Sequence, residues 1–79
     1  MVIQVYVGNL SPQTTQGEIR RLFQPYGYIT SVHLMADNAG RACGFAFVTM
    51  DPYGAGKAIT ALHKEVVDGQ NITVHLRVV

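Results

Sequence analysis

A change of hydrophobic period, from strand-like to helical and back, occurs twice along this chain and constrains its fold more than any other feature. Apolar side chains alternate with polar ones where a strand buries one face, and they recur every three or four residues where a helix does. Because this order is repeated, the sequence predicts two successive strand–helix–strand units with no linker between them. The predicted strands are residues 2–7, 29–36, 43–50 and 71–78, and the predicted helices follow Thr15 and Asp51.

Each predicted helix begins at a capping signal. Thr15 and Glu18 form a capping box, in which the hydroxyl and the carboxylate each accept a hydrogen bond from a backbone N–H that lacks a helical partner. Asp51 followed by Pro52 is typical of an N-cap and a first helical position. Each helix then carries one apolar stripe at helical spacing, which predicts one buried face. The stripes are Ile19, Leu22, Phe23 and Tyr26 in the first helix, and Ala55, Ala58, Ile59 and Leu62 in the second.

The last predicted strand alternates over its whole length. A tight-turn signal, Asp68 followed by Gly69, precedes it. We expect its apolar side chains to face the core and its polar side chains to face solvent. The apolar set is Ile72, Val74, Leu76 and Val78, and the polar set is Asn71, Thr73, His75 and Arg77.

These patterns predict an α+β two-layer sandwich. One apolar stripe on each helix and one apolar face on the sheet are buried together when both helices cover the same side of the sheet. The other side then stays open to solvent. A chain of 79 residues that is 48% apolar fits a single folded domain over residues 1–79 rather than a disordered segment.

Charge and cysteine content exclude several classes of function. Six Lys and Arg stand against five Asp and Glu, so the net charge is +1 and only specific sites can attract nucleic acid or anionic membrane. The single cysteine, Cys43, excludes an internal disulfide and a CxxC zinc site. The sequence shows neither a signal peptide nor an apolar run of the ~18 residues that a membrane span needs. We therefore expect a small soluble protein, cytoplasmic or, in a eukaryote, nuclear.

Side-chain parity predicts which residues lie on the open face of the sheet. If Val5 and Val7 face the core, Gln4 and Tyr6 face solvent, because successive side chains of a strand point to opposite faces. The reverse parity in the third strand would bury its two Phe, but it would expose Val48 and bury Cys43. The favoured parity therefore puts aromatic side chains on an open sheet face, where bases of nucleic acid stack at ~1–3 kcal/mol each. The outward set of the third strand is Cys43, Phe45, Phe47 and Thr49.

Two strings in these strands resemble the signatures of the RNA-recognition motif family. Residues 43–50, Cys-Gly-Phe-Ala-Phe-Val-Thr-Met, resemble the RNP1 octamer, and residues 5–10, Val-Tyr-Val-Gly-Asn-Leu, resemble the RNP2 hexamer. They lie in the expected order on the first and third strands, and the resemblance spans essentially the whole chain. The sequence is similar to small bacterial proteins with one such domain and to glycine-rich RNA-binding proteins. The resemblance implies a ferredoxin-like fold, strand–helix–strand–strand–helix–strand, with a four-stranded antiparallel sheet in order 4-1-3-2 that binds single-stranded RNA.

The resemblance also implies a role for individual residues. Tyr6 and Phe47 would each stack on a base, and Phe45 would lie against sugars. Gly44 would let the ligand approach the backbone closely. Asn9, after the first strand, would tether its loop, with direct RNA contact as the alternative. The candidate RNA-binding residues are Tyr6, Phe45, Phe47, Gln4, His33, Arg41, His75 and Arg77.

The candidate cations and histidines have plainer alternatives. Cys43 stands where the family usually has an Arg or Lys that pairs with a phosphate, so we expect Arg41 and Arg77 to supply the charge, with solvated surface arginines as the alternative. His33 and His75 have outward parity and contact a base or are ordinary surface histidines. Met50 replaces an aromatic at a core position, where a flexible thioether packs well. His63, at the end of the second helix, is expected to be structural, where a positive charge would suit the helix dipole.

The sequence gives no support for catalysis, a metal or a cofactor. Cys43, His33 and His75 would lie on an open sheet surface without a carboxylate partner or a pocket. We expect a monomer that binds single-stranded RNA, or single-stranded DNA in vitro, in post-transcriptional regulation or RNA chaperoning. The alternative, favoured by the low charge and by Cys43, is a domain of this fold that binds protein and has weak or no RNA affinity.

Overall fold

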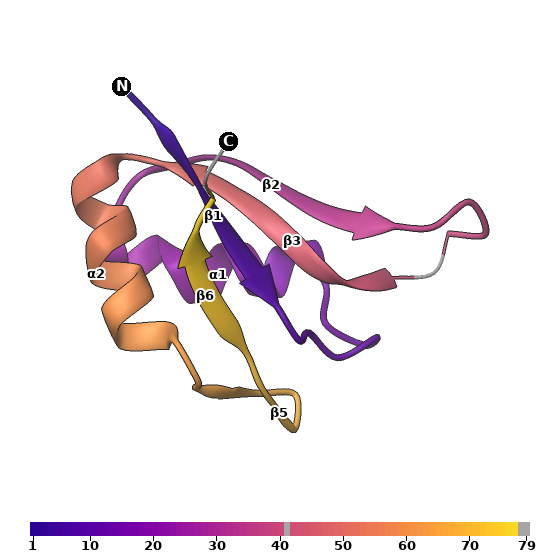
Figure 1. The fold of residues 1–79 in the computed structure, drawn as a ribbon. Helices are drawn as coiled ribbons and strands as arrows, with labels where there is room; N and C mark the ends of the chain where they lie inside the picture. The colour runs from indigo at the N-terminus through magenta and orange to yellow at the C-terminus, as the bar shows by residue number, and fades with distance from the viewer. Residues whose placement is uncertain (41, 78–79) are drawn as a thin grey trace.

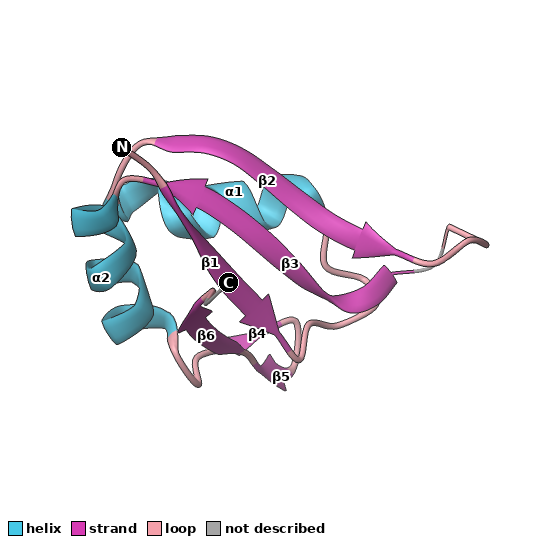
Figure 2. Cartoon of the chain, turned by 45° about the horizontal axis from the view of Figure 1, so that its top comes forward, coloured by secondary structure: helices cyan, strands magenta, loops and turns pink. Residues whose placement is uncertain are grey.

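One layer of the structure is a four-stranded antiparallel sheet, and the other contains two α-helices that lie on the same side of that sheet (Figure 1 and Figure 2). The computed structural model describes residues 1–40 and 42–77. The helical elements are α1 (Gln16–Phe23), the 3-10 helix η1 (Gln24–Tyr26) and α2 (Pro52–Leu62). The strands are β1 (Ile3–Gly8), β2 (Ile29–Ala36), β3 (Ala42–Met50), β4 (Val66–Val67), β5 (Gln70–Asn71) and β6 (Thr73–Leu76).

The strand order of the main sheet is β2-β3-β1-β6. Each neighbouring pair is antiparallel, so β1 and β3 are central and β2 and β6 are the edges. This confirms the predicted α+β sandwich and the order 4-1-3-2, since β6 is the last strand along the chain. The two strands that carry the aromatic residues are therefore adjacent.

The capping signals form as the sequence predicts. The Thr15 side chain accepts a hydrogen bond from the Glu18 N–H at 3.2 Å, and the Glu18 carboxylate accepts one from the Thr15 N–H at 3.4 Å. The Asp51 carboxylate accepts from the Gly54 N–H at 2.7 Å, with Pro52 at the first helical position. Neither α-helix in the described part of the chain has the length and hydropathy needed to cross a membrane.

The core lies between the helices and the sheet. Val48 and Met50 of β3 are fully buried, as are Val5 and Val7 of β1, so the favoured parity is correct and the reverse parity is wrong. Both helix stripes face this core, with Leu22, Tyr26 and Ile59 only partly buried at its margin. The other buried apolar residues are Leu10, Ile19, Phe23, Ile29, Val32, Ala46, Ala55, Ala58, Leu62, Ile72 and Val74.

The end of the chain differs from the prediction of one strand over residues 71–78. Asn71 belongs to β5, which pairs with β4 in a small hairpin whose turn residues Asp68 and Gly69 have φ of 50° and 81°. A new strand, β6, then begins at Thr73, and residues 78–79 lie outside the described residues. Leu76 is 50% exposed rather than buried, because it ends an edge strand that has a neighbour, β1, on one side only.

Candidate nucleic-acid interface

Three aromatic side chains, Tyr6, Phe45 and Phe47, form what we call the aromatic cluster, on the sheet face opposite the helices. Their ring centroids are 5.8 to 5.9 Å apart. Phe45 lies nearly parallel to Tyr6, at 29°, and nearly perpendicular to Phe47, at 80°. All three side chains are half-buried. The cluster is thus an apolar surface open to solvent, built on the two central strands.

The strand register continues this surface into a row that crosses the whole sheet. His33 of β2 lies opposite Phe47 of β3, Phe47 opposite Tyr6 of β1, and Tyr6 opposite His75 of β6. We call these four residues the cross-strand row. The ring of His75 stacks on Tyr6, with centroids 6.4 Å apart and planes inclined by 18°. At ~4.8 Å between strands, the row is about 14 Å long.

Both histidines of the row are exposed, and each extends the aromatic surface toward one edge of the sheet. An imidazole can stack on a base with its face and hydrogen-bond to a base with its nitrogens. The exposure of His33 and His75 agrees with the predicted outward parity.

Arg77 and Gln4 are coupled to each other and to the aromatic cluster. The Arg77 guanidinium lies 4.3 Å from the centre of the Phe47 ring, and its Nη1 donates a hydrogen bond to the Gln4 side-chain oxygen at 2.6 Å. The Arg77 backbone N–H also donates to the Gln4 carbonyl, at 2.9 Å. A base that lay between the guanidinium and the ring would contact each of them at ~3.5–4 Å. The two groups would then have to be almost twice as far apart as they are. Arg77 therefore lies directly over one face of Phe47 and leaves no room for a base between them.

The start of β3 departs from the family pattern in its side chain and is unusual in its backbone. The Cys43 thiol is exposed, as its parity predicts. Gly44 has a φ of 87°, which side chains rarely adopt, and its carbonyl accepts a hydrogen bond from the Leu10 N–H at 2.9 Å. This backbone conformation alone gives a reason for glycine at this position, independent of any ligand. Arg41, the other predicted cation, lies outside the described residues.

Asn9 tethers the loop after β1, as expected. Its side-chain amide donates to the Asn71 carbonyl at 2.8 Å, and its own carbonyl accepts from the Gln70 side chain at 2.9 Å. These two bonds connect the end of β1 to the β4–β5 hairpin. The contribution of Gln70 was not predicted, because it depends on a hairpin that the alternation of apolar residues does not reveal.

His63 has a structural role, as predicted, and it acts through a hydrogen bond to β6. Its Nδ1 accepts a hydrogen bond from the Val74 N–H at 3.0 Å, which requires an unprotonated nitrogen. The His63 ring also lies 4.9 Å from the ring of His75, so it supports one end of the cross-strand row.

Metal ligands do not gather anywhere in the part of the chain that the structure describes. No group of three or more His, Cys, Asp or Glu side chains there could hold an ion. Among the described residues, the open sheet face offers ring stacking and hydrogen bonding, and it holds the Arg77 guanidinium over Phe47.

Residues 5–73 match the family described as RNA recognition motif, and this chain belongs to that family. It is 41% identical over 78 residues to glycine-rich RNA-binding protein 1 of Mycosarcoma maydis, a match that covers 96% of this chain and 45% of that protein. It is 39% identical over 71 residues to a cytoplasmic and nuclear polyadenylate-binding protein of Eremothecium gossypii, covering 89% of this chain and 12% of that protein. The chain thus spans less than half the length of these relatives.

Solved structures confirm the fold. The structure of RNA binding protein PG1 superimposes with a TM-score of 0.91 and 34% identity, covering 95% of this chain and 93% of that one. A Sxl-lethal protein in complex with RNA gives a TM-score of 0.88 and 32% identity, covering 95% of this chain and 47% of that one. The family is a non-enzymatic, RNA-binding type of domain, which agrees with the prediction that the chain is not an enzyme.

Proposed function

We propose that this chain, as one domain over residues 1–79, binds single-stranded RNA by stacking bases along the cross-strand row. The observation that carries the proposal is the aromatic cluster, because three rings within 6 Å of one another lie on an open sheet face instead of in the core. Bases of every kind have a face that stacks on such rings, so the surface suits single strands. Similarity to a glycine-rich RNA-binding protein supports RNA as the ligand.

Within this proposal, Tyr6 and Phe47 each stack on one base, and Phe45 packs against the sugars between them. His33 and His75 contact the flanking bases. Because the row is only four residues long, we expect a footprint of about two to four nucleotides.

Arg77 exchanges partners in this scheme. In the free domain its guanidinium occupies the Phe47 face on which a base would stack. A base that stacks there displaces Arg77 from Phe47 and from Gln4, and the released guanidinium can then pair with a phosphate. Such pairs are charge-assisted and therefore among the stronger hydrogen bonds. The exchange gives up the contacts of Arg77 with Phe47 and Gln4 for a contact with a phosphate, so the net gain in binding free energy is small.

An NMR titration tests the proposal. The isotope-labelled domain is titrated with a short oligonucleotide taken from a random-pool RNA selection at controlled salt, while the aromatic resonances are followed. We expect the largest shifts at Tyr6, Phe45 and Phe47, and the same site for a DNA oligonucleotide of that sequence. Shifts confined to the helices, or no enrichment of RNA in the selection, would contradict the proposal.

The cellular role follows from the ligand. A small domain that holds a few unpaired nucleotides fits post-transcriptional regulation or RNA chaperoning, in the cytoplasm or the nucleus. Crosslinking of RNA to the protein in cells of its source, followed by sequencing, tests this role.

A further inference from the structure

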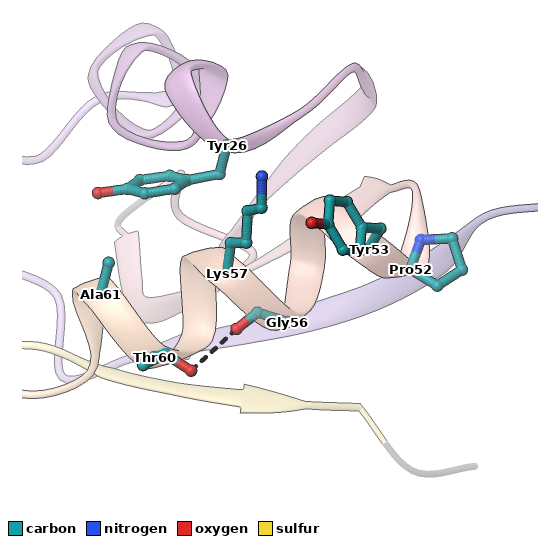
Figure 3. A pocket seen from close by; sticks show the side chains of 7 residues that line it. All are labelled: Tyr26, Pro52, Tyr53, Gly56, Lys57, Thr60 and Ala61. Atoms are coloured by element: carbon teal, nitrogen blue, oxygen red, sulfur yellow. Dashed lines mark hydrogen bonds between the residues drawn. The ribbon is translucent and has the colours of Figure 1, made fainter.

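An open groove of about 680 Å³ lies on the outer side of α2, between this helix and Tyr26 of η1 (Figure 3). The outer residues of α2 recur at helical spacing and are all exposed, whereas the core stripe of the same helix faces the sheet. Tyr26 and Tyr53 lie on either side of the Lys57 side chain, which rises from α2 between them (Figure 3). The lining residues are Tyr26, Pro52, Tyr53, Gly56, Lys57, Thr60 and Ala61.

Gly56 has no evident role inside the domain. A glycine within a helix costs about 0.5–1 kcal/mol relative to alanine. At Gly54 the fold accounts for that cost, because an added Cβ would lie 2.5 Å from the Tyr26 carbonyl oxygen. At Gly56 an added Cβ would meet nothing within 4 Å, and its φ is not positive. A molecule that approaches the α2 backbone from outside would account for this glycine.

The rest of the lining indicates the chemistry of such a molecule. The Thr60 hydroxyl is already bonded to the Gly56 carbonyl at 3.1 Å, as Figure 3 shows, so it leaves the floor of the groove apolar. Lys57 is the only charged residue in the lining, and its Nζ lies 4.4 Å from the centre of the Tyr53 ring. The groove therefore combines apolar walls with one positive charge and no negative charge of its own.

We propose that this groove binds a short peptide segment of a partner protein, in which a large apolar side chain stands next to an Asp or Glu. The apolar side chain would lie over Gly56, and the carboxylate would reach Lys57, which stands between the two tyrosines. A peptide is favoured over a second stretch of RNA, because the single lysine of the lining cannot neutralise a run of phosphates. The proposal is independent of RNA binding on the opposite face of the sheet.

The proposal is tested by selecting binders from a phage-displayed library of random heptapeptides. The Gly56→Leu domain is added as a competitor, so that peptides which bind elsewhere on the domain are removed. In Gly56→Leu the new side chain extends into open space and fills the groove. We expect enriched peptides to carry a large apolar residue within two positions of Asp or Glu. No enrichment over the Gly56→Leu domain, or enrichment without acidic residues, would overturn the proposal.

An enriched peptide, made synthetically, is then titrated into the labelled domain. We expect amide shifts along α2 and at Tyr26, with Phe47 unaffected. Binding falls at least tenfold in Gly56→Leu, and two- to fivefold when Lys57→Met removes the charge or when Asn or Gln replaces the acid in the peptide. Gly17→Leu is the matched control, because it adds the same side chain to α1, where an added Cβ meets only the Thr15 hydroxyl at 4.0 Å.

Measuring the RNA affinity of the same variants distinguishes the peptide proposal from the proposed RNA binding. Gly56→Leu leaves RNA affinity unchanged if the cross-strand row binds RNA and the groove binds peptide. An RNA titration that shifts α2 and is abolished by Gly56→Leu would overturn the peptide proposal and assign the groove to RNA. A peptide that instead shifts Tyr6 and Phe47 would overturn it as well.

Discussion

Phe47 and Tyr6 can be tested for binding separately from folding, because both are half-buried on the open face. We expect Phe47→Ala and Tyr6→Ala each to weaken RNA binding by ~1–3 kcal/mol, the contribution of one stacked base. Isothermal titration calorimetry measures this loss, and denaturant unfolding measures stability.

Val48→Ala is the matched control for these two variants, because Val48 is next to Phe47 in β3 but fully buried. Its loss leaves a cavity, so we expect a larger decrease in the free energy of unfolding than for either aromatic variant. Similar losses of folding and binding in all three variants would contradict the assignment of the stacking residues.

The partner exchange of Arg77 predicts a particular salt dependence. With Arg77 and Arg41 as the two phosphate contacts, the log–log slope of affinity against salt is about −1.4, at ~0.7 per contact for a single strand. Arg77→Ala reduces the slope to about −0.7 and also uncovers Phe47. We therefore expect this variant to bind more weakly at low salt and to approach or exceed the wild type at high salt. Parallel curves, or a wild-type slope steeper than about −3, would contradict the scheme.

Cys43 offers a gain-of-function test at the same scale. Its thiol is exposed, so an arginine fits there without unfolding the domain. We expect Cys43→Arg to tighten RNA binding several-fold, by on the order of 1 kcal/mol, and to steepen the salt slope by ~0.7. Cys43→Ser changes neither quantity, which separates added charge from lost sulfur. An affinity that does not rise in Cys43→Arg would count against RNA on this face.

At the scale of one helix, we predict opposite effects on the free energy of unfolding when each of the two glycines of α2 is replaced by alanine. Gly56→Ala stabilises the domain by about 0.5–1 kcal/mol, because the methyl group meets open space and the helix gains propensity. Gly54→Ala destabilises it by ~1–3 kcal/mol, since the added Cβ would press on backbone atoms of Tyr26 and Gly27. Denaturant unfolding measures the free energy of unfolding of both variants. A change of the same sign in both would contradict the packing described for α2.

For the molecule as a whole, periodicity was enough to predict the two α-helices, the strands of the main sheet and the buried face, but not the β4–β5 hairpin. Caps and apolar stripes are local patterns, so Thr15, Asp51 and the inward valines were identifiable from the sequence. The matching signatures of the RNA recognition motif then supplied the strand order, which local patterns do not contain. The aromatic cluster followed from parity combined with those signatures.

What the sequence did not reveal depends on contacts between distant residues. Arg77 and Gln4 are 73 positions apart, and no spacing rule predicts that one would hold the other over Phe47. The bond between His63 and Val74 required knowledge of which strand lies at the edge of the sheet. The groove beside α2 depends on where the η1 turn places Tyr26, which helical periodicity assigned simply to the core.

The His63–Val74 bond also bears on self-association. The outer edge of β6 carries backbone groups that could pair with a strand of another molecule, the usual route to open-ended aggregates. His63 already occupies the Val74 N–H, and β6 is only four residues long, so a second chain would gain few bonds there and would first have to break this one. We therefore expect the free domain to sediment as a monomer, and His63→Ala to dimerise or aggregate at lower concentration. A single imidazole would thus keep the sheet from growing at the edge where the cross-strand row ends.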